Sequence, residues 1–396
     1  MKIAFIVPRF EPDLAGGAEV HCQRLAERVA ASGHQVELFS TCARDHFTWK
    51  NHYEPGNKAV NGVTVRRFLV DPNRVTPRFL LIQRKIDHRV PISEKEELAW
   101  MEDSVRSRRM EEFMAKNKDR YDWFIFMPYL FGTTYWGIQS AQEKSLLIPC
   151  LHDEPFAYLE IFKKMFNQAQ GVMFNTYPEM NLAKNIYQMP DEKATMVSMG
   201  FESNANAEPS LFRNKYNVRD PFILFAGRRE GGKNIDLLMN YFRAFNKQYK
   251  TNLKLVLMGS GKVDLSGEDK NFIFDLGYVP EEYKKSASSA ALVFCQPSVN
   301  ESLSIVLMES WAAGRPVMVH GDCAVTKDHC RRSNGGLYFK NYPEFEECVN
   351  YLKNNPAIAD KMGQNGRDYV KNEYSWEAVL KRFEESVNKF KSNGIS

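Results

Sequence analysis

Two stretches of this sequence repeat one pattern, in which a short apolar strand is followed by glycine and then by an amphipathic helix. The first stretch has its strand at residues 3–7, then Gly16 and Gly17, then a helix and a second strand at residues 35–40. The second stretch begins with a strand at residues 222–226. In a strand–helix–strand unit the helix returns the chain to the same end of the sheet, so the two strands run parallel, with a right-handed crossover. The sequence therefore predicts two α/β halves, each built on a parallel sheet.

The composition is ordinary for a soluble globular protein, and 396 residues are enough for two or three domains. Hydrophobic residues make up 43% and charged residues 26% of the chain. The net charge of +4 is too small to indicate a nucleic-acid partner. Seven cysteines without a C-x-x-C pair predict neither a disulfide framework nor a zinc site. Reduced thiols in the cytoplasm are the simplest explanation.

Membrane contact is open at this stage. The chain has no run of 18 apolar residues, and its first apolar run is too short for a signal peptide, so we expect no membrane span. Residues 74–89 carry five Lys or Arg against one Asp, with four apolar residues at positions 79–82. This segment fits an anionic membrane face or lipid carrier. It also fits a solvated helix with extended basic side chains. Residues 94–118 are predicted to form one charged helix.

A helix is predicted shortly after residue 300. Leu303, Val306 and Leu307 recur at helical spacing, and Gly314 followed by Pro316 is a common helix stop. The unpaired amides of a helix N-terminus bind anions, so Ser302 and Ser304 at its opening suit a diphosphate.

Two glutamates flank this helix opening. Glu309 lies eight positions after Glu301, roughly 12 Å along a helix axis. Neither carboxylate has an obvious partner nearby in the sequence, and carboxylates accept hydrogen bonds from vicinal hydroxyls. The pair can hold two ends of an elongated, hydroxyl-rich ligand. The plain alternative is a helix cap and a solvated surface residue.

The glycine loop of the second half resembles a phosphate-binding loop. Gly227, Gly232 and Lys233 match G-x-x-x-x-G-K, but Asn234 stands where the magnesium-binding Ser or Thr belongs. A P-loop ATPase is therefore a weak alternative for this loop.

A cluster of His152, Asp153 and Glu154 follows a predicted strand at residues 146–151, where α/β folds bind ligands. The adjacent spacing is poor for shared metal chelation, so we expect no metal here. A structural histidine and a ligand-binding histidine both remain possible readings of this position.

Several of these motifs together resemble one enzyme family. The turn at residues 297–298, the pair Glu301 and Glu309, and residues 313–317 resemble the signature of the retaining GT-B glycosyltransferases of family 4, the group with the phosphatidylinositol mannosyltransferases. The hallmark of that family is E-x7-E, usually with Gly-Phe-Gly after the first Glu. Residues 302–304 are Ser-Leu-Ser here, which changes the shape of the sugar pocket.

The resemblance implies an α/β GT-B fold of two Rossmann-like domains facing a cleft, with a C-terminal helix that crosses back to the first domain. The expected domains are an acceptor-binding domain at residues 1–203, joined by the helix at 375–396, and a nucleotide-sugar-binding domain at 204–374.

The resemblance also implies the site. Catalytic roles fall to His152, Glu301, Arg228 and Lys233. The implied contacts are, for the donor diphosphate, Gly16, Gly17, Arg228, Lys233, Ser304 and Ile305; for the donor sugar, His152, Glu301, Ser302 and Leu303; and for the nucleoside, Gly259, Tyr278, Val279 and Glu309.

The implied reaction is transfer of a hexose from a nucleoside diphosphate sugar, expected to be a UDP-sugar, to a hydroxyl of a glycan, glycolipid or small molecule. No cofactor and no metal are expected, and the sequence has no Asp-x-Asp. Expected partners are the donor, the acceptor and the inner membrane face, in cell-envelope polysaccharide synthesis. The alternatives are a nucleotide-sugar 2-epimerase, a GDP-mannose-using transferase and a non-catalytic GT-B-like scaffold.

Overall fold

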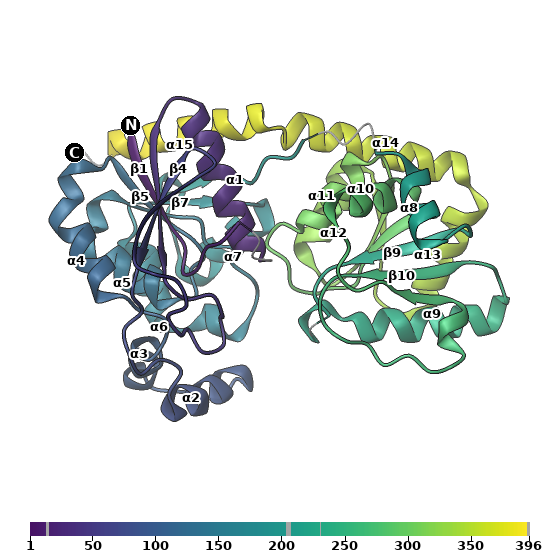
Figure 1. Cartoon of the computed structure of the whole chain (residues 1–396), viewed down its shortest axis with the longest axis horizontal. Coiled ribbons are helices and arrows are strands. Elements are labelled where there is room, and N and C mark those ends of the chain that lie inside the picture. Colours follow the sequence, from purple (N-terminus) through teal and green to yellow (C-terminus); the bar gives the residue numbers. More distant parts are fainter. Residues whose placement is uncertain (13–15, 203–206, 230, 394–396) are drawn as a thin grey trace. The chain divides into compact units, whose positions relative to one another are not determined.

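The chain forms two compact units, seen in a computed structural model that describes residues 1–12, 16–202, 207–229 and 231–393. The first unit is Met1–Gly200 with Trp376–Ser396, and the second is Phe201–Ser375 (Figure 1). The expected boundary at 203/204 falls outside the described residues.

The first unit is built on an eight-stranded sheet of described residues, in the order β3-β4-β2-β1-β5-β6-β7-β8. All neighbouring strands are parallel except β3 and β4. The strands are β1 (Lys2–Ile6), β2 (Gln35–Thr41), β3 (Gly56–Val60), β4 (Val63–Phe68), β5 (Trp123–Phe126), β6 (Ser145–Leu147), β7 (Gly171–Phe174) and β8 (Ala194–Met196). The run β4-β2-β1-β5-β6-β7 has the Rossmann order 3-2-1-4-5-6.

Helices cover both faces of this sheet. Two separate clusters of buried apolar residues show this arrangement. One cluster contains residues of α1 and α15, and the other contains residues of α3 to α7. The helices of the first unit are α1 (Gly17–Ala31), α2 (Pro77–Asp87), α3 (Glu94–Glu102), α4 (Arg108–Asn117), α5 (Gly132–Ser140), α6 (Glu160–Gln168), α7 (Tyr177–Tyr187) and α15 (Trp376–Asn393). The expected return of the C-terminal helix to the first domain is confirmed (Figure 1).

The second unit has a six-stranded sheet of described residues, in the order β11-β10-β9-β12-β13-β14, with all neighbours parallel. The strands are β9 (Phe222–Ala226), β10 (Lys254–Met258), β11 (Ile273–Asp275), β12 (Val293–Gln296), β13 (Val317–His320) and β14 (Gly336–Phe339). The helices are α8 (Pro209–Tyr216), α9 (Ile235–Tyr249), α10 (Glu281–Ala290), α11 (Ile305–Ala312), α12 (Ala324–Ser333), α13 (Tyr342–Asn354) and α14 (Pro356–Glu373). This order is again 3-2-1-4-5-6, so the order reverses between β9 and β12.

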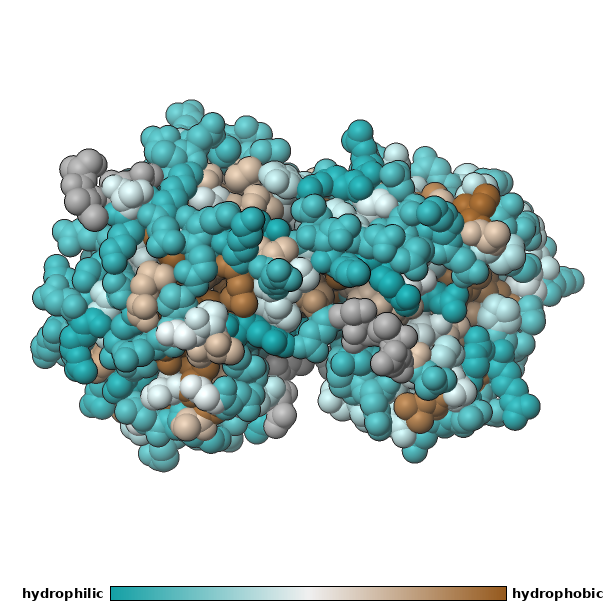
Figure 2. Space-filling model, turned by 90° about the horizontal axis from the view of Figure 1, so that it is seen from above, coloured by the Kyte–Doolittle hydropathy of each residue, from teal (hydrophilic) through white to brown (hydrophobic). Residues whose placement is uncertain are grey.

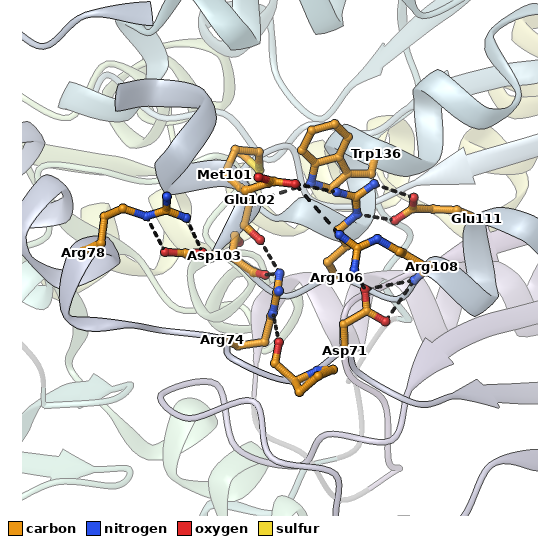
Figure 3. Close-up of polar contacts among 12 residues, drawn as sticks. Asp71, Arg74, Arg78, Met101, Glu102, Asp103, Arg106, Arg108, Glu111 and Trp136 are labelled. Carbon is orange, nitrogen blue, oxygen red and sulfur yellow. Dashed lines mark hydrogen bonds and ion pairs between the residues drawn. The ribbon is translucent and has the colours of Figure 1, made fainter. Parts of the chain in front are cut away.

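The helix predicted at residues 94–118 is wrong as a single element. The structure has α3 and α4 instead, because Ser107 ends the linking turn and caps α4 by accepting a hydrogen bond from the Met110 amide. Figure 3 shows the turn between them, where Asp103 accepts two hydrogen bonds from Arg78.

The described helices include none that is long and apolar enough to cross a membrane. The face of the molecule seen from above is mainly hydrophilic, with separate hydrophobic spots rather than one continuous belt (Figure 2).

Candidate active site in the second unit and its counterpart in the first

The switch point of the second sheet is the part of that unit where a ligand is expected. Strands β9 and β12 are parallel neighbours, so the loops after Ala226 and Gln296 leave the same edge of the sheet. In doubly wound sheets the chain diverges to opposite faces here, which opens a crevice at the carboxyl ends of the strands. The segments 227–234 and 297–304 both begin at this point.

Glu301 is held by two donors from these loops. The ammonium of Lys233 lies 2.6 Å from its Oε1 atom, and the Nε2 atom of Gln296 donates to the same oxygen at 2.7 Å. The Glu301 side chain is only 9% exposed. Lys233 reaches Glu301 from a loop distant in sequence, so this partner could not be found among the neighbouring residues. For the Oε2 atom, the described residues provide no hydrogen bond, which leaves its lone pairs for a hydroxyl.

The glutamate pair does not share a helix. Helix α11 begins at Ile305, and Ser304 before it has a φ of 65°, a left-handed conformation that stops the helix from extending back to Glu301. Ser304 is buried, and its Oγ atom has no hydrogen-bond partner among the described residues. The 12 Å estimate along one axis therefore does not apply, although Ser302, Leu303 and Ser304 still lie at the helix opening.

Glu309 is also paired, again with a residue distant in sequence. Its Oε2 atom lies 3.0 Å from the Nζ atom of Lys284 on α10, which contacts Glu281 at the same distance. Burial opposes the charge of Lys284, but the carboxylates of Glu309 and Glu281 outweigh it and raise the pKa of this lysine. Nothing in the sequence singles out Lys284, because it is one of two adjacent lysines on a polar helix.

The two neighbouring arginines after β9 differ in role. Arg229 is buried and forms an ion pair with Asp275, so it ties the loop after β9 to the end of β11, across β10. Arg228 is partly exposed. Asn234, at the former P-loop Ser/Thr position, has a φ of 55° and donates from Nδ2 to the Pro297 carbonyl at 3.1 Å. This bond ties the Lys233 loop to the Glu301 loop.

The predicted nucleoside contacts differ in exposure. Gly259 has a φ of 125°, and a Cβ there would lie 2.0 Å from the Gly227 carbonyl oxygen, so glycine is required for the loops after β9 and β10 to meet. Tyr278 is 82% exposed, whereas Val279 is buried in the unit. Val279 therefore offers its backbone rather than its side chain to a ligand.

In the first unit, Gly16 and Gly17 open α1 at the carboxyl end of β1. Gly16 is the N-cap in an extended conformation, and the carboxylate of Glu19 occupies the space where its Cβ would be. Glu19 is neutralised by Arg9, whose Nε atom lies 2.6 Å from Oε1. The helix N-terminus therefore carries a paired carboxylate beside the predicted diphosphate contacts.

His152 follows β6 and is partly exposed. Its Nδ1 atom lies 3.9 Å from Oε1 of Glu154, which accepts a hydrogen bond from the buried Tyr129 hydroxyl at 2.7 Å. The Tyr129 hydroxyl thus holds the Glu154 carboxylate near the imidazole of His152.

Glu179 is a buried residue that the sequence reasoning missed. It accepts hydrogen bonds from the amide of Leu151, next to His152, at 2.7 Å and from the amide of Asn175 at 2.6 Å. Burial raises the pKa of Glu179 to about 8, against these hydrogen bonds. The T-x-x-E pattern of Thr176 and Glu179 is a sequence signature of a helix start, and it could have drawn attention to Glu179; Thr176 accepts a hydrogen bond from the Glu179 amide.

Among the described residues, neither a metal cluster nor the large cavity of the second unit coincides with the predicted site residues. Within the described ranges, no group of three or more His, Cys, Asp or Glu is arranged to hold a metal ion. A cavity of about 730 Å³ in the second unit is lined by Arg243, Lys247, Asp269 and their neighbours, and contains none of the predicted site residues.

Comparison with known proteins agrees with the two-unit architecture. Sucrose-phosphate synthase from Thermosynechococcus elongatus superimposes with a TM-score of 0.75 at 18% identity, covering 99% of each chain. Anabaena HepE, in complex with UDP and glucose, superimposes with a TM-score of 0.69 at 14% identity, covering 98% of this chain and 99% of that one. These similarities establish the GT-B fold.

Sequence comparison adds the family of the second unit. The chain is 24% identical to an uncharacterized glycosyltransferase of Methanocaldococcus jannaschii, over 99% of this chain and 98% of that protein. It is 24% identical to a lipopolysaccharide 1,2-N-acetylglucosaminetransferase of Salmonella typhimurium, over 50% of this chain and 58% of that protein. Residues 207–369 match the family of glycosyl transferases group 1. The chain therefore has the GT-B fold and carries a glycosyltransferase group 1 domain at residues 207–369.

Proposed function

We propose that this protein is a retaining, metal-independent glycosyltransferase that moves a hexose from a UDP-sugar to a hydroxyl acceptor. The observation that carries the proposal is Glu301 at the β9/β12 switch point, where Lys233 and Gln296 both hold Oε1. Two donors on one oxygen fix the carboxylate and turn Oε2 into a preorganised acceptor for a sugar hydroxyl.

The diphosphate is assigned to the loop cations and the opening of α11. Lys233 is a point charge with three donors, so it can keep Glu301 and also bind a phosphate oxygen. Arg228 adds a guanidinium from the same loop. The backbone amides at Ser304 and Ile305 lie at the N-terminus of α11, which is the positive end of the helix dipole. Together these groups would stabilise the charge that develops on the leaving diphosphate.

No side chain is assigned as a nucleophile. His152, beside the fixed carboxylate of Glu154, would orient the donor sugar, while Gly16 and Gly17 would contact the diphosphate. The leaving phosphate oxygen would take the proton of the acceptor hydroxyl on the face where the new bond forms. Glu309 would bind the ribose through Oε1, because Lys284 holds its Oε2.

The choice of UDP rests on similarity alone. HepE, which shares the fold, binds UDP and glucose, and the Salmonella relative is a lipopolysaccharide N-acetylglucosaminetransferase. We therefore place the acceptor among glycans and lipid-linked saccharides.

The test is thermal unfolding in the presence of EDTA with UDP, GDP and their sugars. A ligand at a hundred times its dissociation constant adds about 2.7 kcal/mol to the stability of the folded state. A shift with UDP and UDP-sugars, followed by acceptor-dependent UDP release, would support the proposal. A parallel series without EDTA uses ATP and magnesium, and a shift in that series alone would refute the proposal. Sugar turnover without acceptor would favour the epimerase.

Contact with a membrane is proposed for α2. Leu80 and Leu81 are 55% and 61% exposed there. Arg78 and Lys85 are engaged by Asp103 and Glu96, so the ion pairs fix the helix and leave the leucines outward. A basic helix with outward apolar side chains binds anionic bilayers.

Sedimentation with vesicles of phosphatidylglycerol and phosphatidylcholine tests this contact. The double variant Leu80→Ser, Leu81→Ser should lose binding, whereas Leu98→Ser, at a less exposed leucine on α3, should retain it. Equal sedimentation of both variants, or none by the unaltered protein, would leave α2 as a solvated helix.

A further inference from the structure

We propose that Tyr158 and Asp153, in the segment after β6, form an acceptor subsite, in which a pyranose ring stacks on the tyrosine and gives a hydroxyl to the carboxylate. The inference rests on the proposed function, because it assigns the residues that hold the group receiving the sugar. The occupant is the saccharide part of a lipid-linked acceptor. Asp153 directly follows His152, so the acceptor subsite adjoins the residue assigned to the donor sugar.

Tyr158 is an exposed aromatic side chain that is held in place. Its ring is 50% exposed, and its hydroxyl donates to Oδ1 of Asp153 at 2.8 Å. The guanidinium of Arg89, just beyond the end of α2, lies over the same ring, 5.9 Å from its centroid. Single exposed aromatic residues are common on protein surfaces and need no explanation. Tyr158 differs from them because both its hydroxyl and its ring are held by charged side chains.

Buried tyrosines fix the backbone of η3 (Pro155–Tyr158), the 3-10 helix that ends in this ring. The hydroxyl of Tyr187 donates to the Ala157 carbonyl at 2.8 Å, and the hydroxyl of Tyr129 donates to Oε1 of Glu154 at 2.7 Å. Both ends of η3 are thus anchored from the protein interior. A side chain on such a fixed element loses little conformational freedom when a ligand binds, which favours binding.

A column of stacked rings joins η3 to α2. Phe156 of η3 stacks on Trp100 of α3 with centroids 5.5 Å apart, and Trp100 stacks on Phe79 of α2 at 5.6 Å. The next two residues of α2 are Leu80 and Leu81, the exposed leucines of the proposed membrane contact. Helices α2 and α3 lie side by side (Figure 1). The acceptor subsite is therefore packed against the helix that would meet the bilayer, where the saccharide of a lipid-linked acceptor is presented.

The two side chains have complementary chemistry for a sugar. The face of an aromatic ring is negative, so it attracts the C–H groups on the apolar face of a pyranose. Asp153 uses Oδ1 for the tyrosine hydroxyl, and the described residues provide no hydrogen bond to its Oδ2. That oxygen can accept a hydrogen bond from a sugar hydroxyl at the edge of the stacked ring.

Three variants separate the ring from its hydrogen bond. Tyr158→Ala removes both, Tyr158→Phe keeps the ring alone, and Asp153→Asn keeps the size of the side chain without its charge. Both positions are exposed, so we expect all three variants to fold. Tyr351→Ala is the matched control, because Tyr351 is a 42% exposed tyrosine on α13 in the second unit.

The first measurement is saturation-transfer difference NMR of the whole protein, without a nucleotide. The probes are the methyl glycosides of glucose, galactose, mannose and N-acetylglucosamine. For at least one of them we expect transfer to be strongest at the C–H protons of one ring face. Its dissociation constant should rise about tenfold or more in Tyr158→Ala, and change little in Tyr158→Phe and Tyr351→Ala. No transfer to any probe, or the same affinity in Tyr158→Ala as in the unaltered protein, would overturn the proposal.

The second measurement is acceptor-dependent UDP release, with UDP-glucose or UDP-N-acetylglucosamine and the octyl glycosides of the same sugars. Tyr158→Ala should raise the acceptor KM about tenfold or more, and Asp153→Asn should raise it less. Donor KM and the release of UDP without acceptor should stay unchanged. An equal acceptor KM in Tyr158→Ala and Tyr351→Ala would contradict the assignment. If the unaltered protein releases no UDP, the proposed function fails, while the NMR result still decides whether Tyr158 binds a saccharide.

Discussion

At the scale of single residues, the site consists of charges that are already paired. Glu301 is held by Lys233, and Glu309 by Lys284. In each pair one carboxylate oxygen is used by the lysine and the other has no hydrogen bond among the described residues. Each glutamate side chain can therefore be fixed through one oxygen and still accept a hydrogen bond from a hydroxyl through the other, because a carboxylate has four lone-pair sites.

The two glutamates are expected to differ when each is changed to glutamine. Glu301→Gln puts an amide beside Lys233 and removes a charged acceptor from the sugar, worth about 1.5–3 kcal/mol. Steady-state kinetics should show kcat reduced by about tenfold to a hundredfold. Glu309→Gln is the matched control and should raise the donor KM with kcat nearly unchanged. Equal loss of kcat in both variants would contradict the assigned roles.

Glu179 predicts a dependence of stability on pH. Its pKa rises from 4.5 in the unfolded chain to about 8 in the folded protein. Between these values the unfolded state binds fewer protons, so the free energy of unfolding falls as pH rises, by up to about 1.4 kcal/mol per unit. The contribution is fully present below pH 4.5 and is lost through pH 8.

The measurement is urea unfolding of the unaltered protein and Glu179→Gln at pH 5, 6, 7 and 8. The glutamine variant cannot ionise, so the stability difference between the two proteins should change in favour of the variant as pH rises. A constant difference would mean that Glu179 is ionised throughout and that the amides of Leu151 and Asn175 outweigh its burial.

At the scale of elements, arginine side chains connect the helices of the segment between β4 and β5. Figure 3 shows Arg106 directing two nitrogens at Glu111, with Oε1 and Oε2 each at 2.9 Å. The same guanidinium lies 3.9 Å from the ring of Trp136 on α5. These contacts join the start of α4 to α5, while the exposed Arg108 contacts Asp71 at 3.4 Å.

Arg106 and Arg108 therefore form a matched pair for mutation. Arg106→Ala should lower the free energy of unfolding by about 2 kcal/mol, because it removes a bidentate ion pair and a cation–π contact. Arg108→Ala should change it by less than about 0.5 kcal/mol, because exposed ion pairs contribute little. Guanidinium chloride unfolding gives both values, and similar effects would contradict the distinction between a partly buried and an exposed arginine.

At the scale of the whole molecule, the C-terminal helix is part of the first unit's core. Val379, Phe383, Val387 and Phe390 of α15 are all fully buried there. They pack with residues of β1 and α1, the first elements of the chain. The two ends of the sequence thus share one hydrophobic core, and the second unit is inserted between them.

Truncation of a core residue on α15 should therefore act on one unit only. Phe390→Ala should destabilise the first unit by about 3–5 kcal/mol. Calorimetry should show the transition of that unit shifted down, with the transition of the second unit unchanged. Lys381→Ala, at an exposed position of α15, is the control. A uniform shift of both transitions would indicate a single cooperative unit.

The sequence by itself determined the features that depend on neighbouring residues. Strands, glycine turns and helix stops follow from local conformational preferences, so the two α/β halves with their parallel sheets could be predicted. Glu301, Lys233 and His152 could also be selected as candidates from their places after strands.

Tertiary structure alone decided which side chains meet. Lys233 reaches Glu301 because β9 and β12 are neighbours, and Lys284 reaches Glu309 because α10 packs beside α11. Such pairs join residues far apart in sequence, and no periodicity records them. The left-handed Ser304 was equally hidden, because serine does not favour that conformation and only the surrounding packing maintains it.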